Sequence, residues 1–118
     1  VLQNAEFTDK GVAYIKMTRD VIDQYNVTDE EAAAQVGLIG AVEGYPVYCL
    51  FMDYPSEIRI RIRSRGPRVD KLANKYSGGG HEKAAGAKLP SWDMLDTFIN
   101  ELGDLNQYYQ KTGKDDLF

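Results

Sequence analysis

Alternation of isoleucine and arginine is the clearest pattern along the chain. Residues 57–64 read Glu-Ile-Arg-Ile-Arg-Ile-Arg-Ser, which predicts a strand with the isoleucines on one face and the arginines on the other. The preceding run 46–53 is almost continuously apolar, which is typical of a buried central strand. Because only residues 54–56 separate the two runs, we expect a hairpin whose register is fixed by the alternating isoleucines.

Helical and strand periodicity alternate along the rest of the chain, which predicts an α/β fold with a mixed central β-sheet and flanking helices. We expect one domain spanning residues 1–118, with 1–10 and 111–118 at its periphery and free to fray. The further elements expected are a strand at 11–17, helices at 19–25, 28–40 and 68–76, a strand at 85–89, and a helix that starts at 90–91 with its buried stripe over 95–105.

Composition supports a folded domain. The 118 residues are 43% hydrophobic and include only four prolines, which argues against disorder. No apolar run reaches the roughly 18–20 residues that cross a bilayer, so we expect a cytoplasmic protein with no membrane contact. Cys49 is the only cysteine; an internal disulfide is therefore impossible, and we expect this thiol in the core.

Charge is distributed unevenly. Residues 57–75 contain seven basic and two acidic side chains, a balance of +5, and since the whole chain carries −4 the rest carries −9. An acidic protein that gathers half of its cations in one segment has a localised site for an anion. The alternative is a solvated strand face whose arginines guard a sheet edge.

Three glycines and the single histidine follow the basic segment, as Ser77-Gly78-Gly79-Gly80-His81. Such a run can present several backbone N–H groups as a concave nest or lead into a helix N-terminus, and both arrangements attract anions such as phosphate. The histidine could donate a hydrogen bond, bind a metal or shuttle a proton. The alternative is a flexible turn with an incidental histidine.

These motifs together resemble a known family. Arg63-Ser64, a helix-like segment 69–76, Gly-Gly-Gly-His at 78–81 and Ala-Ala-Gly-Ala at 84–87 occur in the order and spacing of the DHH-associated domain of DHH-family phosphoesterases. The sequence looks most like the nano-RNase type, the bifunctional oligoribonucleases and phosphoadenosine-phosphate phosphatases. The best match covers residues 45–89, and it implies that the chain is one DHH-associated, substrate-binding domain.

The resemblance implies a substrate-binding role for the residues that match its motifs. A guanidinium group at position 63 could also clamp a phosphate through two hydrogen bonds. Three further arginines match only as basic neighbours, and one of them, Arg61, stands where many relatives carry a small residue, which favours a longer or more highly charged ligand. The predicted substrate-binding residues are Arg63, Ser64, Gly78, Gly79, Gly80 and His81, with Arg59, Arg61 and Arg65 as neighbours.

The resemblance also implies chemistry that this chain lacks. Family members use a two-metal centre, usually manganese, held by an N-terminal domain with an Asp-His-His motif. This chain has one histidine and no such motif, and it begins without methionine, so we expect an excised fragment that binds but does not cleave, with no catalytic or metal-binding residue of its own. The expected partners are a short RNA or nucleotide phosphate and the DHH domain of the same protein, with a homodimer left open.

Three alternatives stay open at this point. One is the same domain of a cyclic dinucleotide phosphodiesterase, and another is a noncatalytic nucleic-acid module like the C-terminal domain of alanyl-tRNA synthetase. The third is an independent domain whose glycine run is structural. Long single strands fit less well than short ones, because isoleucine rather than aromatic residues separates the arginines and only Tyr76 is a candidate for base stacking.

Overall fold

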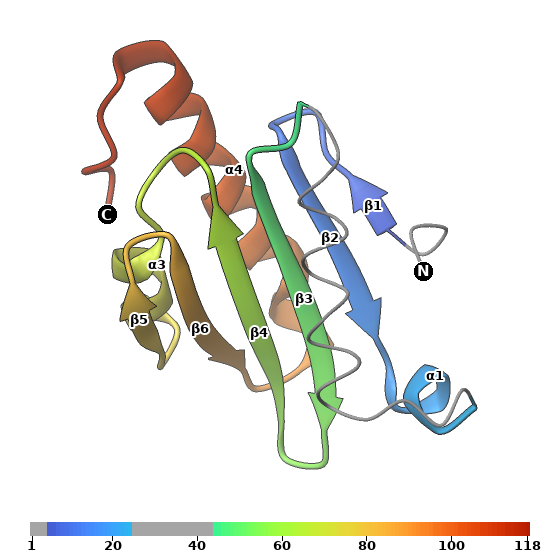
Figure 1. The fold of residues 1–118 in the computed structure, drawn as a ribbon. Coiled ribbons are helices and arrows are strands. Elements are labelled where there is room, and N and C mark those ends of the chain that lie inside the picture. The colour runs from blue at the N-terminus through green and yellow to red at the C-terminus, as the bar shows by residue number, and fades with distance from the viewer. Residues whose placement is uncertain (1–4, 25–43) are drawn as a thin grey trace.

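A computed structural model describes residues 5–24 and 44–118. These residues form one six-stranded sheet with flanking helices (Figure 1), which confirms the predicted α/β fold with a mixed sheet. The predicted helix at 28–40 lies outside the described residues. The elements are β1 (Ala5–Phe7), β2 (Val12–Met17), α1 (Arg19–Gln24), β3 (Val47–Tyr54), β4 (Glu57–Ser64), α3 (Asp70–Lys75), β5 (Gly79–His81), β6 (Ala84–Leu89), the 3-10 helix η2 (Trp92–Met94) and α4 (Leu95–Thr112).

The sheet has the strand order β1-β2-β3-β4-β6-β5. Strands β2 and β3 run parallel, and every other neighbouring pair is antiparallel. The β3–β4 hairpin is confirmed, with Tyr54 opposite Glu57 and Phe51 opposite Ile60. The apolar run therefore forms an interior strand, flanked by β2 and β4.

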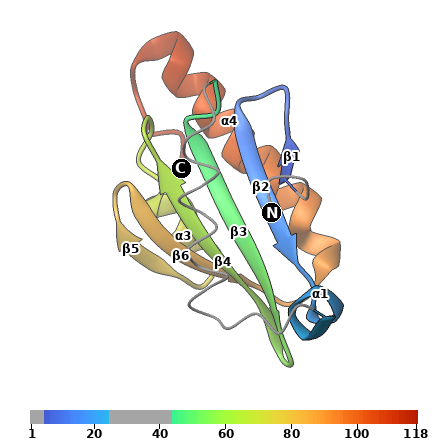
Figure 2. The same cartoon turned by 45° about the vertical axis from the view of Figure 1, so that its right-hand side comes forward.

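Helices α3 and α4 cover one face of the sheet, behind the strands in Figures 1 and 2. The predicted isoleucine face points toward them, with Ile58, Ile60 and Ile62 at most 3% exposed. Helix α4 contributes the predicted stripe, since Leu95, Phe98, Ile99, Leu102 and Leu105 are all buried. The helix ends at Gly113, which adopts a left-handed conformation with φ 73° and whose N–H donates to the carbonyl of Tyr109.

The opposite face is divided between an apolar and a basic half. Over β2 and β3 it carries a second buried cluster that includes Ile15 and Leu50, with Ile22 of α1 packed against it. Over β4 it carries the arginines, because each arginine of the strand is paired with a residue of this face of β3: Leu50, for example, lies opposite Arg61. Of the described helices, α3 and α4 lie on the other side and α1 packs on the apolar half, so none of them covers the basic half.

Two short strands were not predicted, β1 and β5. The glycine run was expected as a loop nest or a helix entry, whereas it forms the edge strand β5, joined to β6 by the two-residue turn Glu82–Lys83. The predicted helix at 68–76 is shorter and spans only Asp70–Lys75. Next to it, the C-terminal segment folds back, and Asp115 accepts a 3.0 Å hydrogen bond from the backbone N–H of Arg68.

Candidate functional site

Strand β4 places the arginine row. Its alternation buries the three isoleucines and leaves Arg59 and Arg61 exposed and Arg63 half-buried on the opposite face. Antiparallel pairing holds β4 on both sides, by β3 along its whole length and by β6 from Ile58 to Arg63. The arginines therefore lie on an interior strand, which fixes the spacing of their side chains.

The register brings Arg63 and His81 into one row across the sheet. Both residues are paired with Ala84 of β6, Arg63 from one side and His81 from the other. Since neighbouring strands lie about 4.8 Å apart, the two Cα atoms are separated by roughly 10 Å. The sheet thus brings together the two predicted residues that could hold an anion between them, above a floor made by one small side chain.

Gly78, just before β5, and Gly80 within it are required by the close approach of two backbones. A Cβ atom on Gly78 would lie 1.9 Å from the carbonyl oxygen of Gly86. Gly80 has φ 138°, and a Cβ there would lie 2.8 Å from the carbonyl oxygen of Ala84. The run therefore lets β5 lie tightly on β6, and it offers an anion the outward-facing backbone groups of an edge strand rather than a nest.

Carboxylates neutralise the basic segment unevenly. Arg59 donates to Glu57 over 2.8 Å, and this hydrogen bond raises the pKa of the guanidinium group. Arg68 donates two hydrogen bonds of 2.9 and 2.8 Å to Asp70, which lowers the pKa of that carboxyl group. Lys75 is paired with Glu101. These three cations are therefore occupied within the protein.

Arg61 and Arg63, which lie nearest to the Arg63–Ala84–His81 row, have no carboxylate partner among residues 5–24 and 44–118. Arg63 donates from Nη1 to the carbonyl of the adjacent Ile62, 2.9 Å away. Arg65 donates to the carbonyl of Tyr45 over 3.2 Å. Arg61 makes no hydrogen bond or ion pair with any residue in 5–24 or 44–118. The net positive charge of the face is concentrated at this end of β4.

Ser64 points away from this row. It follows the isoleucine face of β4, and its side chain is buried on the side of the helices. The hydroxyl group donates to the carbonyl of Pro67 over 2.6 Å and accepts from the N–H of Gly66 over 3.0 Å. Its hydrogen bonds therefore shape the turn that leaves β4, and the structure does not bring this side chain to the face of Arg63.

A Ser64→Ala variant is expected to lose about 1–3 kcal/mol of unfolding free energy, because a buried N–H and a buried carbonyl would lose their partner. Urea denaturation measures the loss. The matched control is Ser56→Ala, since Ser56 is exposed in the β3–β4 turn, and we expect a change within about 0.5 kcal/mol. Equal effects of the two substitutions would contradict the structural role of the Ser64 hydroxyl.

Tyr76 does not offer its ring to a ligand. The ring packs edge-on against Phe98 with centroids 5.0 Å apart, and the hydroxyl group donates to Glu101. Burial, followed by this carboxylate, raises the pKa of the phenol to about 12. The phenol is therefore neutral, and the half-buried ring is packed against the core, which argues against base stacking at this position.

Sequence reasoning missed a hollow beside the arginine row. It has a volume of about 230 Å³ and is lined by residues of β3, β4 and β6, including Tyr54, Arg61, Gly86 and Lys88. The guanidinium group of Arg59 stacks on the ring of Tyr54, 4.1 Å from its centroid. Alternation along β6 would have placed Gly86 and Lys88 on one face, but only the register of β6 against β4 reveals that this face carries the arginines.

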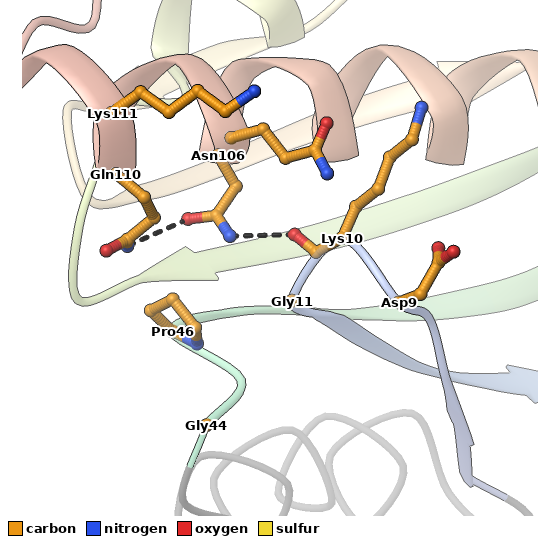
Figure 3. A pocket seen from close by; sticks show the side chains of 9 residues that line it. Asp9, Lys10, Gly11, Gly44, Pro46, Asn106, Gln110 and Lys111 are labelled. Carbon is orange, nitrogen blue, oxygen red and sulfur yellow. Dashed lines mark hydrogen bonds between the residues drawn. The ribbon is translucent and has the colours of Figure 1, made fainter.

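A larger cavity, of about 550 Å³, lies elsewhere, between the start of β2 and the second half of α4 (Figure 3). The amide group of Asn106 is 3% exposed, donates to the carbonyl of Lys10 over 2.8 Å and accepts from Gln110 over 3.3 Å. These polar groups are engaged with one another. The cavity shares no residue with the arginine row, so we interpret its amide network as a link between Lys10 and α4.

Two further properties of the described residues bear on the kind of site. Within 5–24 and 44–118, no three His, Cys, Asp or Glu side chains are grouped so that they could hold a metal ion, so these residues do not fit a two-metal centre. None of the helices in those ranges is long and apolar enough to cross a membrane.

The structure is that of a small α/β domain. One half of a sheet face, over β4, is basic, and the glycine-containing edge strand β5 borders it. Residues 9–107 match the DHHA1 domain. The chain therefore belongs to the DHHA1 domain family, and the resemblance seen in its motifs is confirmed.

Relatives place this domain within longer proteins. The chain is 35% identical over 105 residues to the bifunctional oligoribonuclease and PAP phosphatase NrnA of Bacillus subtilis, covering 89% of this chain and 34% of that protein. A protein of Streptococcus mutans described as a probable NrnA is 29% identical over 106 residues, again covering 89% and 34%. The chain thus spans about a third of the length of these relatives.

Solved structures share the fold. An exopolyphosphatase-related protein from Bacteroides fragilis superposes with a TM-score of 0.79 at 20% identity, covering 91% of this chain and 34% of that one. The C-Ala domain of alanyl-tRNA synthetase from Aquifex aeolicus superposes with a TM-score of 0.62 at 14% identity, covering 87% and 97%. At these identities the likeness concerns the fold alone.

Proposed function

We propose that this DHHA1 domain binds and positions the phosphate end of a short oligoribonucleotide, or of a nucleotide such as 3′-phosphoadenosine 5′-phosphate, for a DHH-family phosphoesterase. The observation that carries the proposal is the row in which Arg63 and His81 flank Ala84, on a half of the sheet that no described helix covers. An arginine that has no carboxylate partner in the described part of the chain and lies beside the small side chain of Ala84 suits a phosphate oxygen.

The charge distribution along β4 and the relatives of this domain support the proposal. Arg61 and Arg63 have no carboxylate partner among the described residues, whereas Arg59 is paired with Glu57, so we expect the face to attract an anion at the end of β4 that carries Arg61 and Arg63. The relatives named above are described as oligoribonucleases and PAP phosphatases, and both of those ligands carry a phosphate next to a nucleoside.

In the proposed whole protein, hydrolysis belongs to the DHH domain, with two Mn²⁺ ions that would activate water there. The residues of this chain would bind, orient and hold the phosphate, and none would ligate a metal. In this assignment Arg63 clamps the phosphate, and His81 and the edge of β5 close the other side of the row. Ser64 supports the strand end from below.

Removal of the Arg63 guanidinium tests the proposal. We expect Arg63→Ala to raise the Kd of a 5′-phosphorylated dinucleotide about tenfold, because one charge-assisted hydrogen bond contributes on the order of 1.5 kcal/mol. Amide chemical shifts during titration of the chain report both affinity and location. Residues 79–84, together with the end of β4, are expected to shift.

Lys71→Ala is the matched control, since Lys71 is exposed on α3 and its loss changes the net charge by the same amount. This variant is expected to bind the dinucleotide like the parent chain. An unchanged Kd in Arg63→Ala would contradict the phosphate clamp, and much tighter binding of full-length tRNA would favour a noncatalytic nucleic-acid module. Mn²⁺-dependent cleavage by the chain alone would contradict the assignment of hydrolysis to another domain.

A further inference from the structure

Across the sheet, the row of paired residues next to that of Arg63, Ala84 and His81 has fewer side chains. In it, Arg61 lies between Leu50 of β3 and Gly86 of β6, and Gly86 is paired in turn with Gly79 of β5. On the side of β6 and β5, therefore, this row has no side chain at all. The guanidinium group of Arg61 borders an open strip of backbone.

The open space over Gly86 lies beside the positive charge of Arg61. A Cβ atom on Gly86 would meet one atom within 4 Å, the carbonyl oxygen of Ile60 at 3.5 Å, so the place above it is open. It belongs to the hollow of about 230 Å³ that Arg59 also lines. Arg59 is already held by Glu57 and Tyr54, whereas Arg61 has no polar partner among the described residues. One uncompensated cation thus faces the opening.

The spacing of the two rows matches a ligand with two phosphates. Arg61 and Arg63 are two residues apart on one face of β4, which separates their Cα atoms by about 7 Å. Adjacent phosphates of an extended dinucleotide are separated by a similar distance. We propose, on the basis of the function proposed above, that Arg61 and the opening over Gly86 form a subsite for a second phosphate group.

This subsite would make the face selective for ligands that carry two phosphates over mononucleotides. Both an internucleotide phosphate and the 3′-phosphate of a nucleoside bisphosphate offer the required oxygens, and the guanidinium group can bind either one through two hydrogen bonds. Arg61→Ala would leave the row of Arg63 and His81 intact and remove only this preference.

Four probes test the inference by chemical-shift titration of the chain. These are AMP, adenosine 3′,5′-bisphosphate, the dinucleotide ApA and its 5′-phosphorylated form pApA. The chain is expected to bind pApA more tightly than AMP, and Arg61→Ala to raise the Kd for pApA about tenfold while that for AMP changes less than twofold. If adenosine 3′,5′-bisphosphate loses affinity to the same extent as pApA, the subsite accepts a terminal phosphate, and if only pApA does, it requires an internucleotide one.

Gly86→Val is a second variant, which fills the opening and leaves every charge in place. It should weaken pApA and spare AMP, as Arg61→Ala does, whereas Lys71→Ala should change neither. Equal affinities of the parent chain for AMP and pApA, or equal losses for both probes in Arg61→Ala, would overturn the second subsite while leaving the Arg63 clamp intact. Insensitivity of every probe to Arg63→Ala would instead overturn the proposed function, and this inference with it.

Discussion

Gly78→Ala is expected to lower the unfolding free energy of the domain by about 3 kcal/mol or more, at the upper end of what a single added methyl group costs. The new Cβ would lie 1.9 Å from the carbonyl oxygen of Gly86 and 2.7 Å from the Cα of Ala87. Both atoms belong to the backbone of β6, which is paired with β4 on its other side. Neither can move aside without breaking that pairing.

Urea denaturation of the variant measures this loss, and hydrogen exchange of the β5 amides reports whether the strand has separated from β6. Gly86→Ala is the matched control, one strand away. Its Cβ would find only an ordinary contact at 3.5 Å and its φ is not positive, so we expect no loss and a gain of up to roughly 1 kcal/mol from the reduced freedom of the unfolded chain. A Gly78→Ala variant as stable as Gly86→Ala would contradict the close packing of β5.

Local patterns were sufficient for the interior of the sheet. The isoleucine alternation of β4 and the apolar run of β3 each encode one element and its buried face, and the hairpin between them follows from a three-residue gap. Both were predicted correctly. Long elements with a strong hydrophobic period are the ones that sequence alone can place.

Strand β5 could not be found in this way because its three residues, Gly79–His81, have no hydrophobic period. Its pairing with β6 is a long-range property of the fold, and so is the alignment of Gly86 with the arginines. The glycine run was interpreted as a ligand-binding feature. At position 78, however, glycine is required because the backbone of β6 lies too close for a side chain. A sequence shows that a side chain is absent, but not what occupies the space.

Ser64 illustrates the opposite case. The alternation of side chains along a strand assigns this residue to the face of Ile62, since one position separates the two. The structure places it there. The family resemblance had grouped Ser64 with Arg63 as a pair of substrate-binding side chains. Its role in binding stays a prediction. Because adjacent residues on a regular strand project to opposite faces, this alternation predicted the position of the hydroxyl group better than the resemblance did.

The sheet face that carries the arginines is supported from the other side by an aromatic cluster. Phe98 of α4 is fully buried and lies edge-on to Phe51 of β3 and to Tyr76, with ring centroids 5.9 and 5.0 Å away. It therefore joins the interior of the sheet to the end of α3. The carbonyl of Tyr76 accepts a 2.8 Å hydrogen bond from the N–H of Lys88 in β6, so the cluster also helps to fix the chain just before the glycine strand.

Phe98→Ala is accordingly expected to cost about 3–5 kcal/mol of unfolding free energy, because the surrounding backbone cannot collapse into the cavity and two edge-to-face contacts disappear. Phe7→Ala is the control, since Phe7 is 44% exposed and its ring lies tilted against that of Tyr45, with centroids 4.8 Å apart, and we expect a cost of about 1 kcal/mol or less. Urea midpoints compare the two. Comparable losses would mean that α4 is not anchored through Phe98, and the sheet would then have to hold β5 and the arginine row in place without it.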